Sequence, residues 1–196
     1  MNVPNKITIC RIVLSILLLV LLVFPLNRLG FTFHVLSLSN GINVDSKYLI
    51  CGVIFLIASL TDYLDGHLAR KYNLVTDLGK VIDAIADKIL VNGVLIVLAA
   101  EGAISVIVPV IIVSRDIIVD SIKMVAGQKN GAVGASYAGK VKTAFMLTGI
   151  TLLFFYDLPF SLINIYPARV IIMIATILSI ISGIEYYVKN KKFLTK

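Results

Sequence analysis

The sequence predicts an all-α, polytopic membrane protein with six transmembrane helices and a polar cavity that faces the cytoplasm. The first observation is the composition: of 196 residues, 59% are hydrophobic and 15% are charged, and the mean hydropathy is +0.98. Soluble domains are about 45–50% apolar and about one quarter charged. The second observation is a series of six apolar runs, and the third is that charged residues gather at alternating ends of these runs.

The same composition excludes several other classes of protein. So apolar a chain lacks the polar surface of a soluble domain, and it is neither disordered nor collagen-like. Cys10 and Cys51 have neither the spacing of metal ligands nor the number that a disulfide framework needs. The net charge of +7 in such a chain indicates anionic lipid as a partner and not nucleic acid. We expect residues 1–196 to form a single membrane domain.

Each apolar run is shorter than the roughly 20 residues that a membrane-crossing helix needs. A run reaches that length only by including a neighbouring charged stretch, such as Asp62–Asp65 or Asp83–Asp87. Because consecutive helices alternate in direction, the charged stretches fall on one side of the membrane, where they must line a water-filled cavity. The runs are Ile12–Leu26, Tyr48–Thr61, Ile89–Ala100, Gly102–Ser114, Thr143–Tyr156 and Val170–Ile184.

The distribution of basic residues predicts the orientation in the membrane. With a cytoplasmic N-terminus, the outer loops hold only Arg28, Lys47 and Arg169 of the 18 Lys and Arg residues. This bias follows the positive-inside rule. It places both termini and the cavity on the cytoplasmic side of a multi-pass protein of the cell membrane. Met1–Thr8 is too polar for the core of a signal peptide, so we expect a short interfacial segment that is not cleaved.

Four aspartates are spaced so that they converge. Asp62 and Asp65 share one helix face, as do Asp83 and Asp87, and a helix hairpin brings the two pairs together near its turn. Convergent carboxylates repel one another unless cations neutralise them, and oxygen ligands favour Mg²⁺ or Mn²⁺. Because two such ions can neutralise phosphate oxygens, the pattern predicts a two-metal site for phosphoryl chemistry.

The simpler alternative is that the aspartates form ion pairs inside the membrane with Arg70, Lys80 and Lys88. Such pairs do not account for the small residues around the aspartates, at positions where a ligand or a second helix must approach closely. These small residues are Gly66, Ala69 and Gly79.

Residues 62–87 read D-x2-D-G-x2-A-R-x8-G-x3-D-x3-D, which resembles the signature of the CDP-alcohol phosphotransferase family at all eight fixed positions. The opening Pro4-Asn5-x2-Thr8-x2-Arg11 and the six helices extend the resemblance over the chain. The resemblance implies two divalent cations, Mg²⁺ or Mn²⁺, a CDP-linked donor that releases CMP, and a homodimer.

The resemblance also implies roles for individual residues. The metal ligands would be Asp62, Asp65, Asp83 and Asp87. Asp87 would also be the catalytic base that takes the proton from the acceptor hydroxyl. The CDP-binding residues would be Asn5, Thr8, Gly66, Ala69, Arg70 and Gly79.

Ser114–Asp116 and Gly139–Thr143 resemble segments of the bacterial phosphatidylglycerophosphate synthases in this family. The resemblance implies an enzyme of the bacterial plasma membrane that transfers the phosphatidyl group of CDP-diacylglycerol to sn-glycerol 3-phosphate, giving phosphatidylglycerophosphate and CMP. Arg115, Lys140 and Lys142 would bind the acceptor phosphate, because Arg offers a two-pronged grip and Lys a point charge. Alternatively, these cations hold anionic lipid head groups.

Other functions stay open on the sequence alone. Sibling enzymes use inositol phosphate, phosphatidylglycerol or serine as the acceptor, although a neutral acceptor does not need three cations. A cation-coupled membrane transporter also has intramembrane aspartates, but its site lies at the midplane between inverted repeats. The aspartates of this chain lie at helix ends, and no repeat is evident. A non-catalytic membrane scaffold leaves the four aspartates unexplained.

Overall fold

The computed structural model describes residues 3–25, 30, 33–37, 43–72, 76–130 and 137–194. Over these residues the chain is mostly helical, which confirms the prediction of an all-α protein with six long helices. A short antiparallel hairpin of two strands, which the sequence analysis did not anticipate, lies between the first two helices. The helices are α1 (Val3–Val23), α2 (Ser46–Lys71), α3 (Asp77–Ala100), α4 (Ile107–Asn130), α5 (Tyr137–Phe154) and α6 (Pro167–Leu194), the strands are β1 (Val35–Ser37) and β2 (Asn43–Asp45), and the 3₁₀ helix is η2 (Phe160–Ile163).

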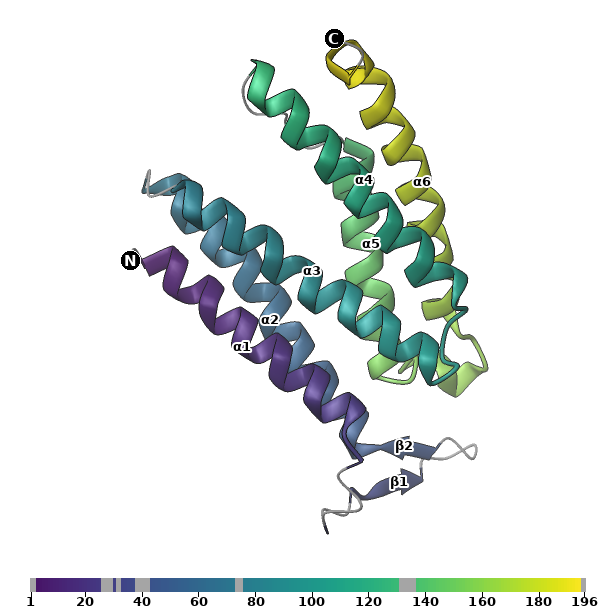
Figure 1. Ribbon diagram of the computed structural model, residues 1–196. Helices are drawn as coiled ribbons and strands as arrows, with labels where there is room; N and C mark the ends of the chain where they lie inside the picture. The colour runs from purple at the N-terminus through teal and green to yellow at the C-terminus, as the bar shows by residue number, and fades with distance from the viewer. Residues whose placement is uncertain are drawn as a thin grey trace.

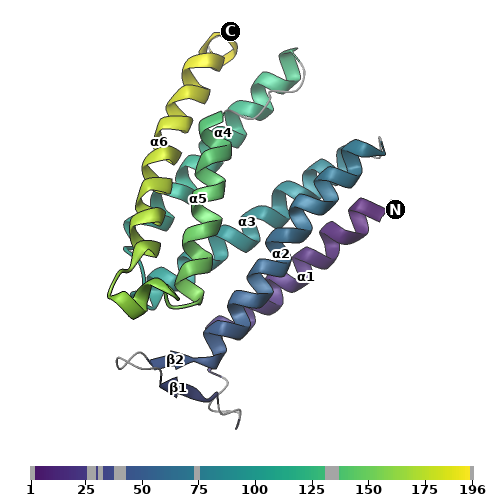
Figure 2. The ribbon, with the colours of Figure 1, turned by 180° about the vertical axis from the view of Figure 1, so that it is seen from behind.

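The six helices form two groups of three (Figures 1 and 2). In the first group α1 packs along α2 and α3, and in the second α6 packs along α4 and α5. The groups touch where α2 lies against α5 and where α3 lies against α4. In both views they come together near the β1–β2 hairpin and diverge toward the end of the bundle that carries both chain termini. The two termini therefore lie at one end, as the alternating helix directions predict.

Two helices in the described part of the chain are long and apolar enough to cross a membrane. They are α1 over Asn5–Val23 and α6 over Pro167–Lys191. Large apolar side chains of α1, including Val13, Ile16 and Val20, are exposed on the outside of the bundle. An apolar outer surface of this kind is typical of a protein that faces lipid.

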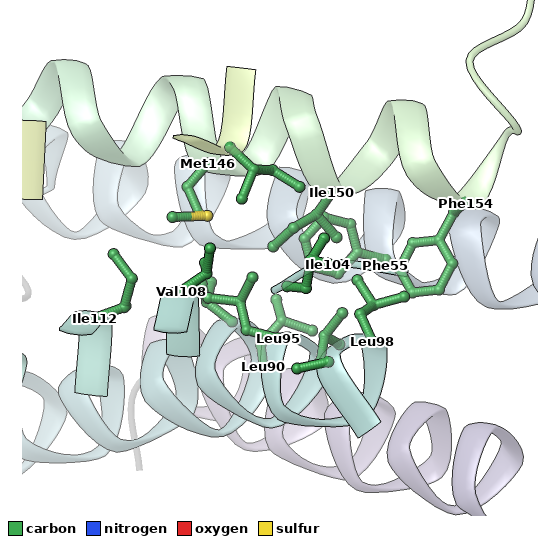
Figure 3. Packing of buried hydrophobic residues seen from close by; sticks show 14 of the residues in the cluster. Phe55, Leu90, Leu95, Leu98, Ile104, Val108, Ile112, Met146, Ile150 and Phe154 are labelled. Carbon is green, nitrogen blue, oxygen red and sulfur yellow. The ribbon is translucent and has the colours of Figure 1, made fainter. Parts of the chain in front are cut away.

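The main apolar cluster lies where the two helix groups meet (Figure 3). Phe55 of α2 faces Phe154 of α5 with 5.7 Å between the ring centres. Leu98 near the end of α3 is buried in the same cluster as Ile104, which precedes α4, and Val108, which is in its first turn. This packing joins the two groups at the end of the bundle opposite the termini, so the charged ends of the helices are left at the other end.

The second group is held together by a close approach of α5 and α6. A Cβ atom at Gly149 of α5 would lie 2.6 Å from the side chain of Ile172 of α6, so only glycine fits there. In the connection before α6, the buried carboxylate of Asp157 accepts a hydrogen bond from the backbone N–H of Ala168 at 2.7 Å. This bond satisfies one of the free N–H groups at the start of α6.

Candidate active site

The aspartates of the signature lie on α2 and α3, near the end of the bundle that carries the termini. Asp62 is on α2, and Asp83 and Asp87 are on α3. The buried Arg11 of α1 donates through Nη1 to Oδ1 of Asp62 at 2.5 Å and to Oδ1 of Asp83 at 3.2 Å. The structure therefore brings carboxylates of α2 and α3 together at one nitrogen. The side chain of Asp65 lies outside the described residues.

Arg11 acts as the counter-ion of this carboxylate pair. A guanidinium in an apolar helix is costly unless opposite charge is near it, and here two carboxylates from different helices supply that charge. Among the described side chains, no three His, Cys, Asp or Glu residues gather closely enough to hold a metal ion. Three of the four predicted metal ligands, Asp62, Asp83 and Asp87, are thus described, and Arg11 brings two of them, Asp62 and Asp83, together.

Asp87 faces a different set of neighbours from Asp83, although both are on α3. It lines a small cavity of about 20 Å³, whose walls also include Asp116 of α4 and Lys142 of α5. This volume holds about one water molecule. The charges that act on Asp87 include those of Asp62 and Asp83 as well as that of Lys142. Asp87 is therefore close enough to be influenced by the charges of the carboxylate pair on one side and of Lys142, in the second helix group, on the other.

Arg115 and Lys142, two of the three residues predicted to bind an acceptor phosphate, share one counter-ion. Oδ1 of Asp116 accepts hydrogen bonds from Nη1 of Arg115 at 3.0 Å and from Nζ of Lys142 at 3.1 Å. Lys142 is buried, whereas Lys140, at the start of the same helix, is exposed. Asp116 thus joins Arg115 to Lys142, whereas Lys140 lies on the surface.

The guanidinium of Arg115 also reaches α6. Its Nη2 donates to Oγ of Ser182 at 2.6 Å, and its Nε donates to the backbone carbonyl of Ser179 at 3.2 Å. The guanidinium carbon lies 5.9 Å from the centre of the Tyr186 ring. Arg115 therefore ties α4 to α6, a contact that the sequence analysis did not predict.

Two of the predicted CDP-binding residues contact each other where α1 and α3 begin. The side chain of Thr76 caps α3 by accepting a hydrogen bond from the N–H of Gly79 at 3.0 Å, and it also accepts one from Nδ2 of the buried Asn5 at 3.2 Å. A Cβ atom at Gly79 would lie 2.7 Å from Oδ1 of Asn5, so glycine is needed for this contact. Thr8 is also buried, one turn further along α1.

The other three predicted CDP-binding residues are on α2. Gly66 is partly buried, and the side chains of Ala69 and Arg70 lie outside the described residues.

Two residues that organise this site, Arg11 and Thr76, have no role that the sequence predicted. A charged residue such as Arg11 within an apolar helix does signal a buried partner. Thr76 is a preferred N-cap residue type, placed just before a helix. Neither signal identifies the contact, because Asp62 and Asn5 come close to these residues only when the helices pack.

Nearly the whole chain matches one protein family. The family model for CDP-alcohol phosphatidyltransferase matches residues 1–181. The chain belongs to the CDP-alcohol phosphatidyltransferase family. This confirms the resemblance drawn from the aspartate signature, and membership of an enzyme family decides against the transporter and the scaffold.

Relatives in this phosphatidyltransferase family match this chain along most of its length. The CDP-diacylglycerol–glycerol-3-phosphate 3-phosphatidyltransferase of Bacillus subtilis is 33% identical over 189 residues, which are 96% of this chain and 95% of that protein. The protein of the same name from Rickettsia felis is 31% identical over 193 residues, covering 98% and 97% of the two chains.

A solved structure shares the fold. The crystal structure of phosphatidylinositol phosphate synthase from Mycobacterium tuberculosis, in its apo form, superposes with a TM-score of 0.61. The match covers 100% of this chain and 90% of the other at 21% sequence identity. The helical arrangement of Figure 1 is therefore one that an experimentally determined structure also has.

Proposed function

We propose that the protein transfers the phosphatidyl group of CDP-diacylglycerol to sn-glycerol 3-phosphate, giving phosphatidylglycerophosphate and CMP. The observation that carries the proposal is the nearly full-length similarity to relatives whose names state this donor and this acceptor. The arrangement of charges suits the reaction, because Asp87 lies between a carboxylate pair and a cavity with a buried lysine.

We infer that two divalent cations, Mg²⁺ or Mn²⁺, bind at Asp62, Asp65, Asp83 and Asp87. Enzymes of this family generally use a divalent metal. The residues fit such a group, because Oδ1 of Asp62 and Oδ1 of Asp83 converge on one positively charged nitrogen, and oxygen ligands suit hard cations. When bound, the metals would withdraw charge from the phosphate oxygens of the donor.

In the proposed reaction Asp87 is the base. Its carboxylate takes the proton from the attacking hydroxyl of the acceptor, whose oxygen then forms a bond to the phosphorus that carries diacylglycerol. The bond from that phosphorus to the CMP oxygen breaks, and CMP leaves. The support for this role is the position of Asp87 on the wall of the cavity that it shares with Lys142.

We propose that the donor nucleotide binds between the starts of α1 and α3 and the end of α2. The support is the contact between Asn5, Thr76 and Gly79, which leaves no room for a side chain at the glycine. The proposed CDP-binding residues are Asn5, Thr8, Gly66, Ala69, Arg70 and Gly79.

We propose that the acceptor phosphate binds to the basic residues of the second helix group, Arg115, Lys140 and Lys142. The support is that Arg115 and Lys142 together carry two positive charges against the single negative charge of Asp116. With the exposed Lys140 the three basic residues leave an excess of two positive charges over Asp116, which a dianionic acceptor matches and a neutral acceptor such as serine does not.

The remaining proposals concern the membrane. We propose six spans in the bacterial plasma membrane, with the active site and both termini in the cytoplasm, and a homodimer. The divergence of the two helix groups toward the end with the termini supports a site at that end (Figure 2), and the excess of Lys and Arg at that end in the six-span arrangement supports its cytoplasmic position.

Replacing Lys142 tests the acceptor. With purified protein, CDP-diacylglycerol and Mg²⁺, CMP release should be faster with sn-glycerol 3-phosphate than with inositol phosphate, phosphatidylglycerol or serine. Lys142→Ala should lower kcat/KM for the acceptor by about 10- to 150-fold, since it removes a charge-assisted contact. The KM for CDP-diacylglycerol should hardly change, and Lys142→Arg should retain more activity.

Lys191→Ala, which changes an exposed lysine near the end of α6, is the matched control. It should leave kcat/KM for the acceptor and the KM for CDP-diacylglycerol unchanged. Equal losses for donor and acceptor in Lys142→Ala would contradict the acceptor site. Faster CMP release with another alcohol would contradict the choice of acceptor and leave the transferase chemistry standing.

Replacing Gly79 tests the donor site. Gly79→Ala puts a Cβ against the side chain of Asn5, so Asn5 must move. Overpacking of this kind costs about 1–3 kcal/mol, which corresponds to a rise of about 5- to 150-fold in the KM for CDP-diacylglycerol if Asn5 binds the donor. Gly127→Ala, where the added Cβ has no neighbour within 4 Å, is the control. A rise in the KM for the acceptor alone would assign Gly79 to the other substrate.

A further inference from the structure

An ion pair connects the two helix groups beside the proposed active site. Nζ of Lys88 on α3 contacts Oδ2 of Asp120 on α4. The other ion pairs between described side chains lie within one group or the other. Neither Lys88 nor Asp120 has a role in the proposed reaction, so this contact calls for a separate explanation.

The ion pair lies next to the residues that the reaction needs from both sides. Lys88 directly follows Asp87, the proposed base, and lines the same cavity. Asp120 is one helical turn beyond Asp116, the counter-ion of the buried Lys142. The pair therefore spans from the helix of the base to the helix that carries the acceptor-side charges.

The apolar cluster reaches the cavity through Val91 of α3 and Met146 of α5, but its α4 members end at Ile112, about two turns before Asp120. Leu98, Ile104 and Val108 join these helices near the end opposite the termini, within the cluster of Figure 3. Toward the other end α3 and α4 diverge in both ribbon views. Among the ion pairs of the described side chains, the one between Lys88 and Asp120 is the pair that joins α3 to α4 beside the cavity.

The exposure of the Lys88–Asp120 pair indicates that it contributes little to the stability of the fold. The side chains of Lys88 and Asp120 are 41% and 39% exposed, and partly exposed ion pairs contribute little to the free energy of unfolding. A displacement of about 1 Å in an active site, however, can lower a rate by about 100-fold. Loss of the pair should therefore affect the reaction much more than it affects the fold.

We propose that Lys88 and Asp120 form a positioning pair that holds α3 and α4 at the spacing in which Asp87 reaches the acceptor. The inference rests on the proposed function, because it takes Asp87 as the base and the side of Asp116 and Lys142 as the acceptor side. Neither Lys88 nor Asp120 touches the reacting atoms.

The kinetic test uses single and paired substitutions. Lys88→Gln and Asp120→Asn should each lower kcat/KM for the acceptor by about 10- to 100-fold, with the KM for CDP-diacylglycerol and the Tm close to those of the wild type. The exchange Lys88→Asp with Asp120→Lys should recover most of the loss, and Lys88→Arg should be nearly neutral. Lys189→Gln breaks the partly exposed Lys189–Glu185 pair of α6 and should change nothing.

The Asp120→Asn variant separates positioning from direct binding. If Lys88 itself bound the acceptor phosphate, its release from Asp120 would leave the KM for the acceptor unchanged or lower it, while Lys88→Gln would raise it. That result, or a failure of the charge exchange to restore activity, would overturn the proposal.

A distance measurement tests the pair without relying on turnover. Spin labels at Ile85→Cys on α3 and Met124→Cys on α4, both exposed positions, should give one narrow distance distribution. The exposed Cys10 is replaced by Ser, and Cys51 is buried. Lys88→Gln should shift the distribution to longer distances and the charge exchange should reverse the shift, whereas an unchanged distribution contradicts the proposal. A wild-type protein that releases no CMP contradicts the proposed function. In that case the distances between the two spin labels still show whether the ion pair sets the spacing of α3 and α4.

Discussion

Turnover should fall below about one thousandth of the wild-type rate when Asp62 or Asp83 is replaced by Asn, since the charge stabilisation that bound metals supply is worth several kcal/mol. Each substitution exchanges a charged oxygen ligand for a neutral amide at the point where the two carboxylates converge. The affinity for Mn²⁺ should fall with the activity. Both can be measured on purified protein, by CMP release and by the electron paramagnetic resonance of free Mn²⁺.

These variants should still fold. Arg11 contacts both carboxylates, so removing one leaves its guanidinium paired with the other, and mutual repulsion among the aspartates decreases. Asp45→Asn in β2, at the opposite end of the bundle, is a matched control that should have wild-type activity and metal affinity. Wild-type turnover in Asp62→Asn or Asp83→Asn would refute the metal site.

The second large effect is expected for Asp87→Asn. An amide cannot take the proton of the acceptor hydroxyl, so kcat should fall by at least about 100-fold, the usual contribution of a general base. Asp87→Glu keeps a carboxylate on the cavity wall and should retain more activity than the amide. Steady-state kinetics with each substrate varied in turn measures both.

Whether Asp87→Asn changes kcat or a KM identifies the role of Asp87. As a base, it should affect kcat more than the KM of either substrate. A loss confined to the KM for the acceptor would make Asp87 a binding residue, and wild-type kcat in Asp87→Asn would disprove its role as the base. Asp45→Asn is again the control.

Much of the fold could be predicted because the pattern of charges and apolar runs is regular. The six runs correspond to six helices, and helices such as α2 are longer than their runs because they include the charged stretches at their ends. The convergence of Asp62 and Asp83 also follows from the sequence, since a hairpin of two helices leaves these residues near its turn. The β1–β2 hairpin was missed, because its three-residue strands are too short to show a period.

Contacts between helices distant in sequence could not be predicted. Arg115 lies on the helix that carries the acceptor-side charges, yet its guanidinium contacts Ser179 and Ser182 of α6. Which face of α4 is turned toward α6 is decided by packing, and the spacing of charges along one helix does not contain that information. The Lys88–Asp120 pair was missed for the same reason.

In the proposed six-span arrangement, the buried Arg11 has a consequence for the order in which the helices enter the membrane. Arg11 is part of α1, the first helix to leave the ribosome, and its partners Asp62 and Asp83 follow 51 and 72 residues later. An unpaired arginine within an inserted helix costs up to about 2.5–3.5 kcal/mol, the value at the helix centre. During synthesis α1 is therefore expected to stay beside the insertion machinery until α3 has arrived, so that the first three helices are released into the lipid together, with Arg11 already paired.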